Sequence, residues 1–220
     1  TGVEPSEMVR PNLPQVSSDT DNPEKELEKI QRLMEQIRVP AFVRDPYSDI
    51  IMANGPMAAL YGMNPSNLEL DLDASGLTFN FPHSFNIIHY LFFQSQPIRA
   101  RVNRDQDWDS YFLNALRTFR ISTLRYRAKP YFDYLMQIFR NPALYPSFER
   151  YWKLTYSMEQ DSEANTYIVS YPSRNLGDMT FMSTSTQFIT AFGELYLVQS
   201  QPVNENTERI FSGLANTYGN

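Results

Sequence analysis

The pattern of hydrophobic positions changes its period twice within one short stretch near the start of the chain. Residues 41–43 and 50–53 are apolar runs of strand length, and the Asp, Pro and Ser residues at 45–49 favour a tight turn between them. Asn54 can accept hydrogen bonds from the first free N–H groups of a helix, and Gly62 ends the short apolar segment that follows. The stretch is predicted to fold as a β-hairpin followed by a helix.

Longer segments carry apolar residues at the period of an amphipathic helix. In the strongest of them, which starts at Asp107, hydrophobic residues recur at i, i+3, i+4, i+7, i+8 and i+11 from Trp108. Asn22 and Pro23 mark the start of another helix. Further helices are predicted at 81–94 with Ser84 as a cap, at 130–139 and from Glu205 onwards.

The last third of the chain contains short β-rich runs divided by Pro, Gly and Ser. The four runs, at 166–171, 179–184, 187–191 and 195–200, predict a closing antiparallel meander, which is expected to contribute three strands to the sheet. With the opening hairpin they predict an α+β fold. In this fold a five-stranded antiparallel sheet carries helices packed on one face, and further helices stand at the N- and C-terminal ends.

The opening stretch resembles the ligand-binding domain of MmyB-like transcription regulators, which has a PAS-like fold. The resemblance rests on the apolar strand at 40–43, the charged turn at 45–49, the second strand ending in Asn54 and the helix ending at 60–62. It implies that the predicted sheet is the PAS sheet. It also implies a ligand site between that sheet and the helices.

Later segments resemble the same family in the same order. Phe148 and Trp152 stand where the family segment FxxLWxxHD has its Phe and Trp, while Thr155 and Tyr156 replace the usual His-Asp pair. Any role of that pair is therefore not carried over to this chain. Pro172 and Gly177 resemble the family's hPxxG turn, with two extra residues between them.

The chain divides into four segments on these grounds. Residues 1–22, rich in Pro, Ser and acidic side chains, are predicted to be a linker, and 23–38 an N-terminal helix. Residues 39–203 form the PAS-like ligand-binding domain and 204–220 a C-terminal helix. The linker contains Arg-Pro-Asn-Leu at 10–13, which resembles the connector to an upstream helix-turn-helix domain, so we expect such a domain outside this chain.

Composition narrows the chemistry that the chain can perform. With 25 acidic and 19 basic residues the net charge is −6, so no overall positive charge attracts nucleic acid or an anionic membrane. The lack of cysteine excludes disulfides, thiolate metal sites and cysteinyl-flavin photochemistry. No apolar run approaches the roughly 20 residues of a membrane span, and we expect a soluble, cytoplasmic protein.

The sequence lacks the usual motifs for dinucleotide, phosphate, zinc, calcium or serine-hydrolase chemistry, and we expect no enzymatic activity and no catalytic residues. His83 and His89 are six residues apart, off a common helix face, so a shared metal ion is not expected. Acidic pairs such as Asp71 and Asp73 are interpreted as solvated turn residues.

The aromatic content indicates a ligand cavity. Phe, Tyr and Trp make up 14% of the residues, and many of them fall on helix faces that should converge on the sheet. The resemblance implies a fatty-acid-like, apolar small molecule as the ligand and no other cofactor. The residues predicted to line its site are Phe85, Ile88, Phe92, Trp108, Phe112, Phe119, Trp152 and Asn54.

By resemblance, the chain is the sensing domain of a transcription regulator, which passes the signal to the upstream DNA-binding domain. Two alternatives remain open at this stage. One is a PAS-like dimerisation module with no ligand. The other is a haem or flavin sensor, in which one of the two histidines could bind haem iron.

Two further features concern partners. The apolar faces of the terminal helices, at 27–37 and 210–214, predict a homodimer, unless these helices complete the core of their own chain.

A basic cluster at the end of the helix after Asp107 could be a solvated helix end, a nucleic-acid patch or the source of one arginine that binds an anionic ligand head. Its members are Arg117, Arg120, Arg125, Arg127 and Lys129.

Overall fold

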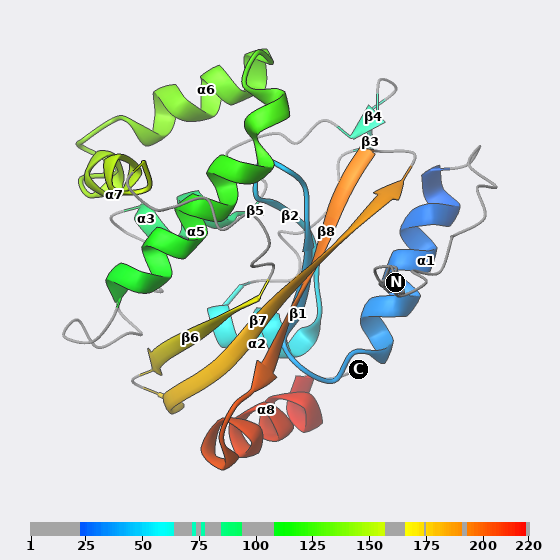
Figure 1. The fold of residues 1–220 in the computed structure, drawn as a ribbon. Coiled ribbons are helices and arrows are strands. Elements are labelled where there is room, and N and C mark those ends of the chain that lie inside the picture. Colours follow the sequence, from blue (N-terminus) through cyan, green and yellow to red (C-terminus); the bar gives the residue numbers. More distant parts are fainter. Residues whose placement is uncertain are drawn as a thin grey trace, which may run out of the picture.

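One antiparallel sheet organises the computed structural model of this chain (Figure 1). The structure describes residues 23–63, 72–73, 76–77, 85–93, 108–156, 166–173, 175–190 and 193–218. The predictions for the linker at 1–22, for His83 and for the Ser84 cap lie outside these residues. Within them, the α+β class and the five-stranded antiparallel sheet with helices on one face are confirmed.

The strand order in the sheet is β5-β2-β1-β8-β7-β6. The strands are β1 (Ala41–Arg44), β2 (Asp49–Ala53), β5 (Phe85–Asn86), β6 (Thr166–Ser173), β7 (Gly177–Thr190) and β8 (Gly193–Pro202). The two-residue strand β5 extends the expected five strands at one edge. β1 lies inside the sheet because it pairs with both β2 and β8. Two further short strands, β3 (Leu72–Asp73) and β4 (Gly76–Leu77), pair with each other.

The predicted runs at 179–184 and 187–191 belong to one long strand, β7, and not to two. Ser185 and Thr186, which the prediction placed between the runs, pair with Val198 and Leu197 of β8 without a break in register. Both residues adopt extended backbone readily when a neighbouring strand supplies hydrogen bonds. Ser185 and Thr186 therefore lie within a continuous strand and do not form a turn.

The helices are α1 (Pro23–Gln36), α2 (Gly55–Tyr61), α3 (Ile87–Phe92), α5 (Trp108–Ser122), the 3₁₀ turn η2 (Leu124–Tyr126), α6 (Pro130–Phe139), α7 (Phe148–Leu154) and α8 (Glu205–Tyr218). Helices α3, α5, α6 and α7 gather on one side of the sheet, and α1 lies on the other (Figure 1). α3 begins later than predicted because Asn86 is its cap, accepting hydrogen bonds from the N–H groups of Ile88 (2.9 Å) and His89 (3.1 Å).

The two faces of the sheet support two separate cores. Phe42 of β1 belongs to the main core under α3 and α5–α7, and its neighbour Val43 belongs to a smaller core under α1. This division follows from the alternation of side chains along a strand. Ile30 and Met34 of α1 are 5% and 3% exposed in the smaller core.

The terminal helices complete the core of their own chain. α1 packs on the sheet through Ile30 and Met34, which are buried in the smaller core. α8 packs against α2, β7 and β8 with Phe211 and Leu214 buried. The apolar faces that predicted a homodimer are therefore largely used within one chain. That argument for a dimer interface no longer holds.

Asn54 forms the junction between the sheet and α2. Its Oδ1 accepts hydrogen bonds from the N–H groups of Ala41 (3.0 Å) and Met57 (3.1 Å). Its Nδ2 donates to the carbonyl groups of Ile37 (3.0 Å) and Val39 (2.8 Å). The capping role predicted from the sequence is confirmed, and the side chain also fixes the segment that joins α1 to β1.

Candidate functional site

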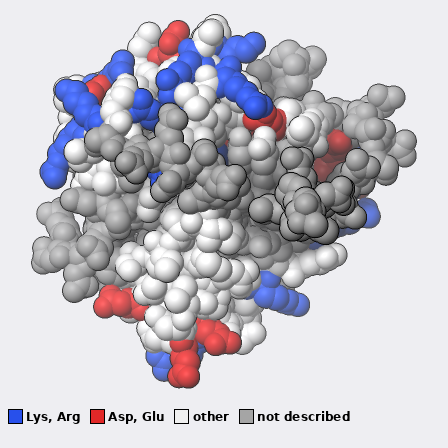
Figure 2. All heavy atoms as spheres, viewed as in Figure 1, with Lys and Arg blue, Asp and Glu red and all other residues white. Residues whose placement is uncertain are grey.

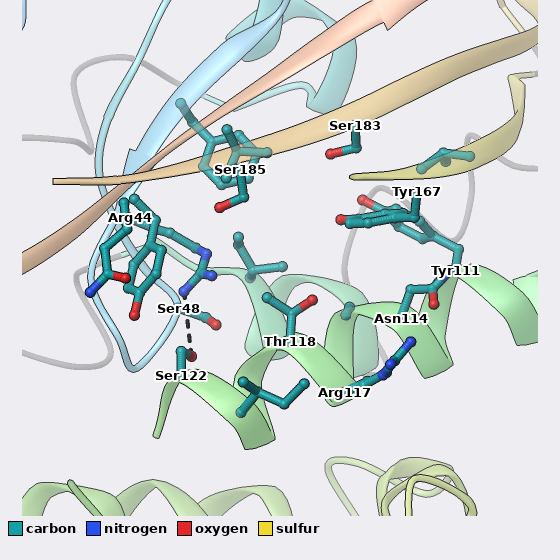
Figure 3. A pocket seen from close by; sticks show the side chains of 18 of the residues that line it. Arg44, Ser48, Tyr111, Asn114, Arg117, Thr118, Ser122, Tyr167, Ser183 and Ser185 are labelled. Carbon is teal, nitrogen blue, oxygen red and sulfur yellow. Dashed lines mark hydrogen bonds between the residues drawn. The ribbon is translucent and has the colours of Figure 1, made fainter. Parts of the chain in front are cut away.

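A cavity of about 440 Å³ lies between the inner face of the sheet and α5 (Figure 3). Cavities of this size are typical of small-molecule sites, which span roughly 300–1,000 Å³. The sheet lines it with Phe42, Arg44, Tyr167, Val169, Phe181, Ser183, Ser185, Gln187, Glu194, Tyr196, Val198 and Ser200. The remaining lining residues are Ser48, Tyr61, Ile87, Tyr111, Asn114, Ala115, Arg117, Thr118, Ile121, Ser122, Leu124 and Arg125.

Arg44 places a buried cation in this cavity (Figure 3). It is the last residue of β1 and is 3% exposed. Its Nη1 donates to the carbonyl of Asp45 (2.9 Å) and makes a longer contact of 3.5 Å with the Ser122 hydroxyl, and its guanidinium lies 4.3 Å from the ring centre of Tyr196. None of the ion pairs among the described residues includes Arg44. Burial lowers the pKa of its guanidinium, which nevertheless stays charged.

The carboxyl group of Asp45, the next residue in the hairpin turn, acts on the Arg44 guanidinium. The N–H of Asp49 donates to Asp45 Oδ1 (2.9 Å), and Ser48 adopts a left-handed backbone (φ 67°) between them. Burial, followed by repulsion from Asp49, raises the pKa of Asp45 well above its usual value. Asp45 is therefore a weak counter-charge for Arg44.

Asp49 makes the stability of the hairpin dependent on pH. It is fully buried and accepts hydrogen bonds from Asn86 Nδ2 (2.8 Å) and from the Tyr131 hydroxyl (2.7 Å), but burial still raises its pKa from 3.8 to about 6. The Asp49 carboxyl group therefore binds its proton more tightly in the folded state than in the unfolded state. The resulting stabilisation is complete below about pH 4 and is lost as the pH rises through about 6.

We expect the part of this loss that comes from Asp49 to disappear in Asp49→Asn, whose side chain carries no titrating proton, while Asp45 still titrates in both proteins. Between about pH 3 and pH 7, the unfolding free energy of the wild type should fall by about 3 kcal/mol relative to that of the variant, from a pKa shift of about two units. Urea denaturation of both proteins across this range measures the difference. A difference that does not change with pH would contradict the assignment.

η2 and the start of β8 both contribute residues to the cavity lining. Arg125 and Glu194 form an ion pair of 3.0 Å there, with side chains 81% and 16% exposed. Figure 2 shows that Lys and Arg side chains gather over the end of the molecule where α6 and the end of α5 lie.

The basic cluster has more than one use. Arg117 and Arg125 line the cavity, whereas Arg120 lies 3.4 Å from the ring centre of Tyr156 and donates to the Thr155 hydroxyl (3.2 Å). The deeply buried arginine in the cavity is Arg44, which comes from β1 and not from this cluster.

The residues predicted to bind the ligand mostly form the aromatic core on the other side of α5. Ile88, Phe92, Phe119 and Trp152 are buried there, and Phe112 packs against Phe92 with 4.8 Å between ring centres. The side chains of Phe85 and Trp108 lie outside the described part of the structure. Among the other six predicted residues, Asn54 included, none lines the cavity.

Sequence reasoning missed Arg44 and the polar residues of α5, β7 and β8. A signal for Arg44 was present, because Phe42 and Arg44 are two residues apart and must point to the same face of β1. An arginine that shares the core face of an interior strand is unusual unless it meets a partner.

His89 is held by neighbouring aromatic residues. Its Nδ1 contacts the Tyr145 hydroxyl (2.6 Å), its ring stacks on Phe93 with centres 4.7 Å apart, and burial lowers its pKa. In the described ranges, no group of three His, Asp or Glu residues is placed to hold a metal ion, and no helix is long and apolar enough to cross a membrane.

Comparison with protein families places this geometry in context. The family model described as the MmyB-like transcription regulator ligand binding domain matches residues 28–214. The match covers the sheet, the cavity and every helix that borders the cavity. A comparison with curated protein sequences finds no match.

Proposed function

Because this chain belongs to the MmyB-like transcription regulator ligand-binding domain family, we propose that it is a sensing domain whose cavity beside α5 binds a fatty-acid-like molecule through its carboxylate. In this proposal, ligand binding changes the activity of a DNA-binding domain of the same regulator. The role is recognition and not catalysis, in keeping with the family.

The observation that carries the proposal is the buried, unpaired charge of Arg44. Holding a cation out of water is costly unless an anion or several acceptors compensate it. Arg44 uses its Nη1 group on Asp45 and Ser122, which leaves donors of the five-donor guanidinium for a further partner. A carboxylate matches the planar fork of a guanidinium with two parallel hydrogen bonds.

The rest of the cavity wall is suited to contact a carbon chain attached to that carboxylate. Apolar side chains of four strands face the cavity, namely Phe42, Val169, Phe181 and Val198. The cavity also counts against a module that only dimerises, because a packed interaction domain has no need of a lined hollow of this size.

Isothermal titration of the purified domain with tetradecanoate and with tetradecan-1-ol tests the proposal. The two probes share a chain, but only the acid carries a negative charge. We expect the acid to bind at least tenfold more tightly, since a hydrogen bond to a charged group contributes about 1.5–3 kcal/mol. Mass spectrometry of a denaturing extract should also detect any acid that the protein retains from its host.

Equal affinity for the acid and the alcohol would remove the role of the carboxylate. Failure of the domain to bind either probe would favour the dimerisation module. A purified protein with visible haem or flavin absorbance would instead support the sensor alternative.

A further inference from the structure

The middle of the cavity carries polar side chains on both walls. Asn114 and Thr118 come from successive turns of α5, and Ser183 and Ser185 come from β7, which borders the cavity from the opposite side (Figure 3). Ser200 of β8 lies beside Ser183, its partner in strand pairing. A site for a plain alkyl chain needs no such groups beyond the head.

These side chains have no partners of their own. In the parts of the chain that the structure describes, no hydrogen bond involves the side-chain amide of Asn114 or the hydroxyls of Thr118, Ser183, Ser185 and Ser200. Ser183 and Ser200 are nevertheless only 4% and 3% exposed. Solvent or a ligand must therefore satisfy them inside the cavity.

A saturated acyl chain in the cavity would leave these hydroxyl and amide groups without hydrogen-bond partners. It would exclude solvent from the hydroxyls and offer them no hydrogen bond, which carries the full penalty of an unsatisfied buried group. A site built to hydrogen-bond oxygen atoms discriminates strongly against an analogue that lacks them. The polar groups on the two walls thus select for oxygen atoms along the ligand.

We infer that the ligand is an oxygenated carboxylic acid, with hydroxyl or keto groups along its carbon chain. The inference rests on the proposed function, in that Arg44 holds the carboxylate. The serine, threonine and asparagine side chains then hydrogen-bond the chain oxygens. Phe42, Val169, Phe181 and Val198 contact the carbon atoms between them.

Titration with a matched series of acids tests this inference. The probes are tetradecanoate and three hydroxytetradecanoates that carry the hydroxyl near the head, at the middle or near the tail of the chain. At least one hydroxy acid should bind about tenfold more tightly than tetradecanoate, because it satisfies groups that the plain acid leaves unpaired.

The double variant Ser183→Ala with Ser185→Ala should remove most of this preference, because it removes two of the hydroxyls that contact the chain oxygens. The matched control is Ser170→Ala with Thr186→Ala, which removes hydroxyls from exposed positions of β6 and β7 and should keep the preference.

The outcomes separate the inference from the function that it deepens. Tetradecanoate binding as tightly as every hydroxy acid would overturn the inference and leave the proposed function standing. A preference that survives in the Ser183 and Ser185 variant, and equally in the control, would overturn the role of β7. Binding of none of the four acids by the folded wild type would overturn both.

Discussion

Arg44→Met is expected to weaken tetradecanoate binding by about a hundredfold while the domain stays folded. The substitution removes the charge-assisted hydrogen bonds to the carboxylate, which contribute about 1.5–3 kcal/mol, and leaves the ligand charge buried without a partner. Replacing a buried, poorly compensated charge with an apolar side chain of similar volume is often neutral or stabilising. The variant should therefore unfold at the wild-type temperature or above it.

Two further variants sharpen this experiment. Arg125→Met removes an arginine that also lines the cavity but whose side chain is 81% exposed, so the affinity should change only slightly. Arg44→Lys keeps the charge but loses the planar fork, and an intermediate affinity is expected. Wild-type affinity in a folded Arg44→Met protein would contradict the placement of the carboxylate.

Asn54→Ala is expected to destabilise the domain strongly. A lost helix cap alone costs about 1 kcal/mol. Here four hydrogen bonds disappear together, and the backbone groups of Ala41, Met57, Ile37 and Val39 lose their partner. We expect a loss of about 4 kcal/mol in unfolding free energy, or a drop on the order of 10 °C in Tm.

Thermal and urea denaturation measure this loss. Asn141→Ala is the matched control, because Asn141 is exposed and its side chain accepts a single hydrogen bond, from the N–H of Ala143 (3.0 Å). The control should lose less than about 1 kcal/mol. If Asn54→Ala lost no more than the control, the junction would not depend on this side chain.

The order of the elements could be predicted because local chemistry and tertiary packing agree along most of this chain. Asn54 is suited to a cap and is one, and the apolar spacing after Trp108 gives α5 as expected. The start of α3 was wrong because Phe85 and Asn86 pair with β2, and a strand contact overrides a local helical preference. Strand β7 was divided at its serines because small polar residues also mark turns.

The site was harder to predict because α5 uses both of its faces. Its most apolar residues, such as Leu116 and Phe119, pack into the aromatic core, and the cavity receives the face with Asn114 and Thr118. A polar helix face and alternating serines in a strand are ordinarily signs of contact with water. Here these polar residues line a cavity because α5 packs over the sheet.

The alternation of side chains along β1 places neighbouring residues in the cavity and on the opposite face of the sheet. Arg44 lies in the cavity and Val43 lies under α1, and the pairing of β1 with β2 shifts register between these two residues. One peptide unit therefore separates a residue of the cavity from a residue that packs under α1, and we expect an anion bound at Arg44, as proposed above, to change the packing of α1. By thermodynamic linkage, a partner that holds α1 in one position changes the affinity for the ligand by the same factor as the ligand changes the affinity for that partner.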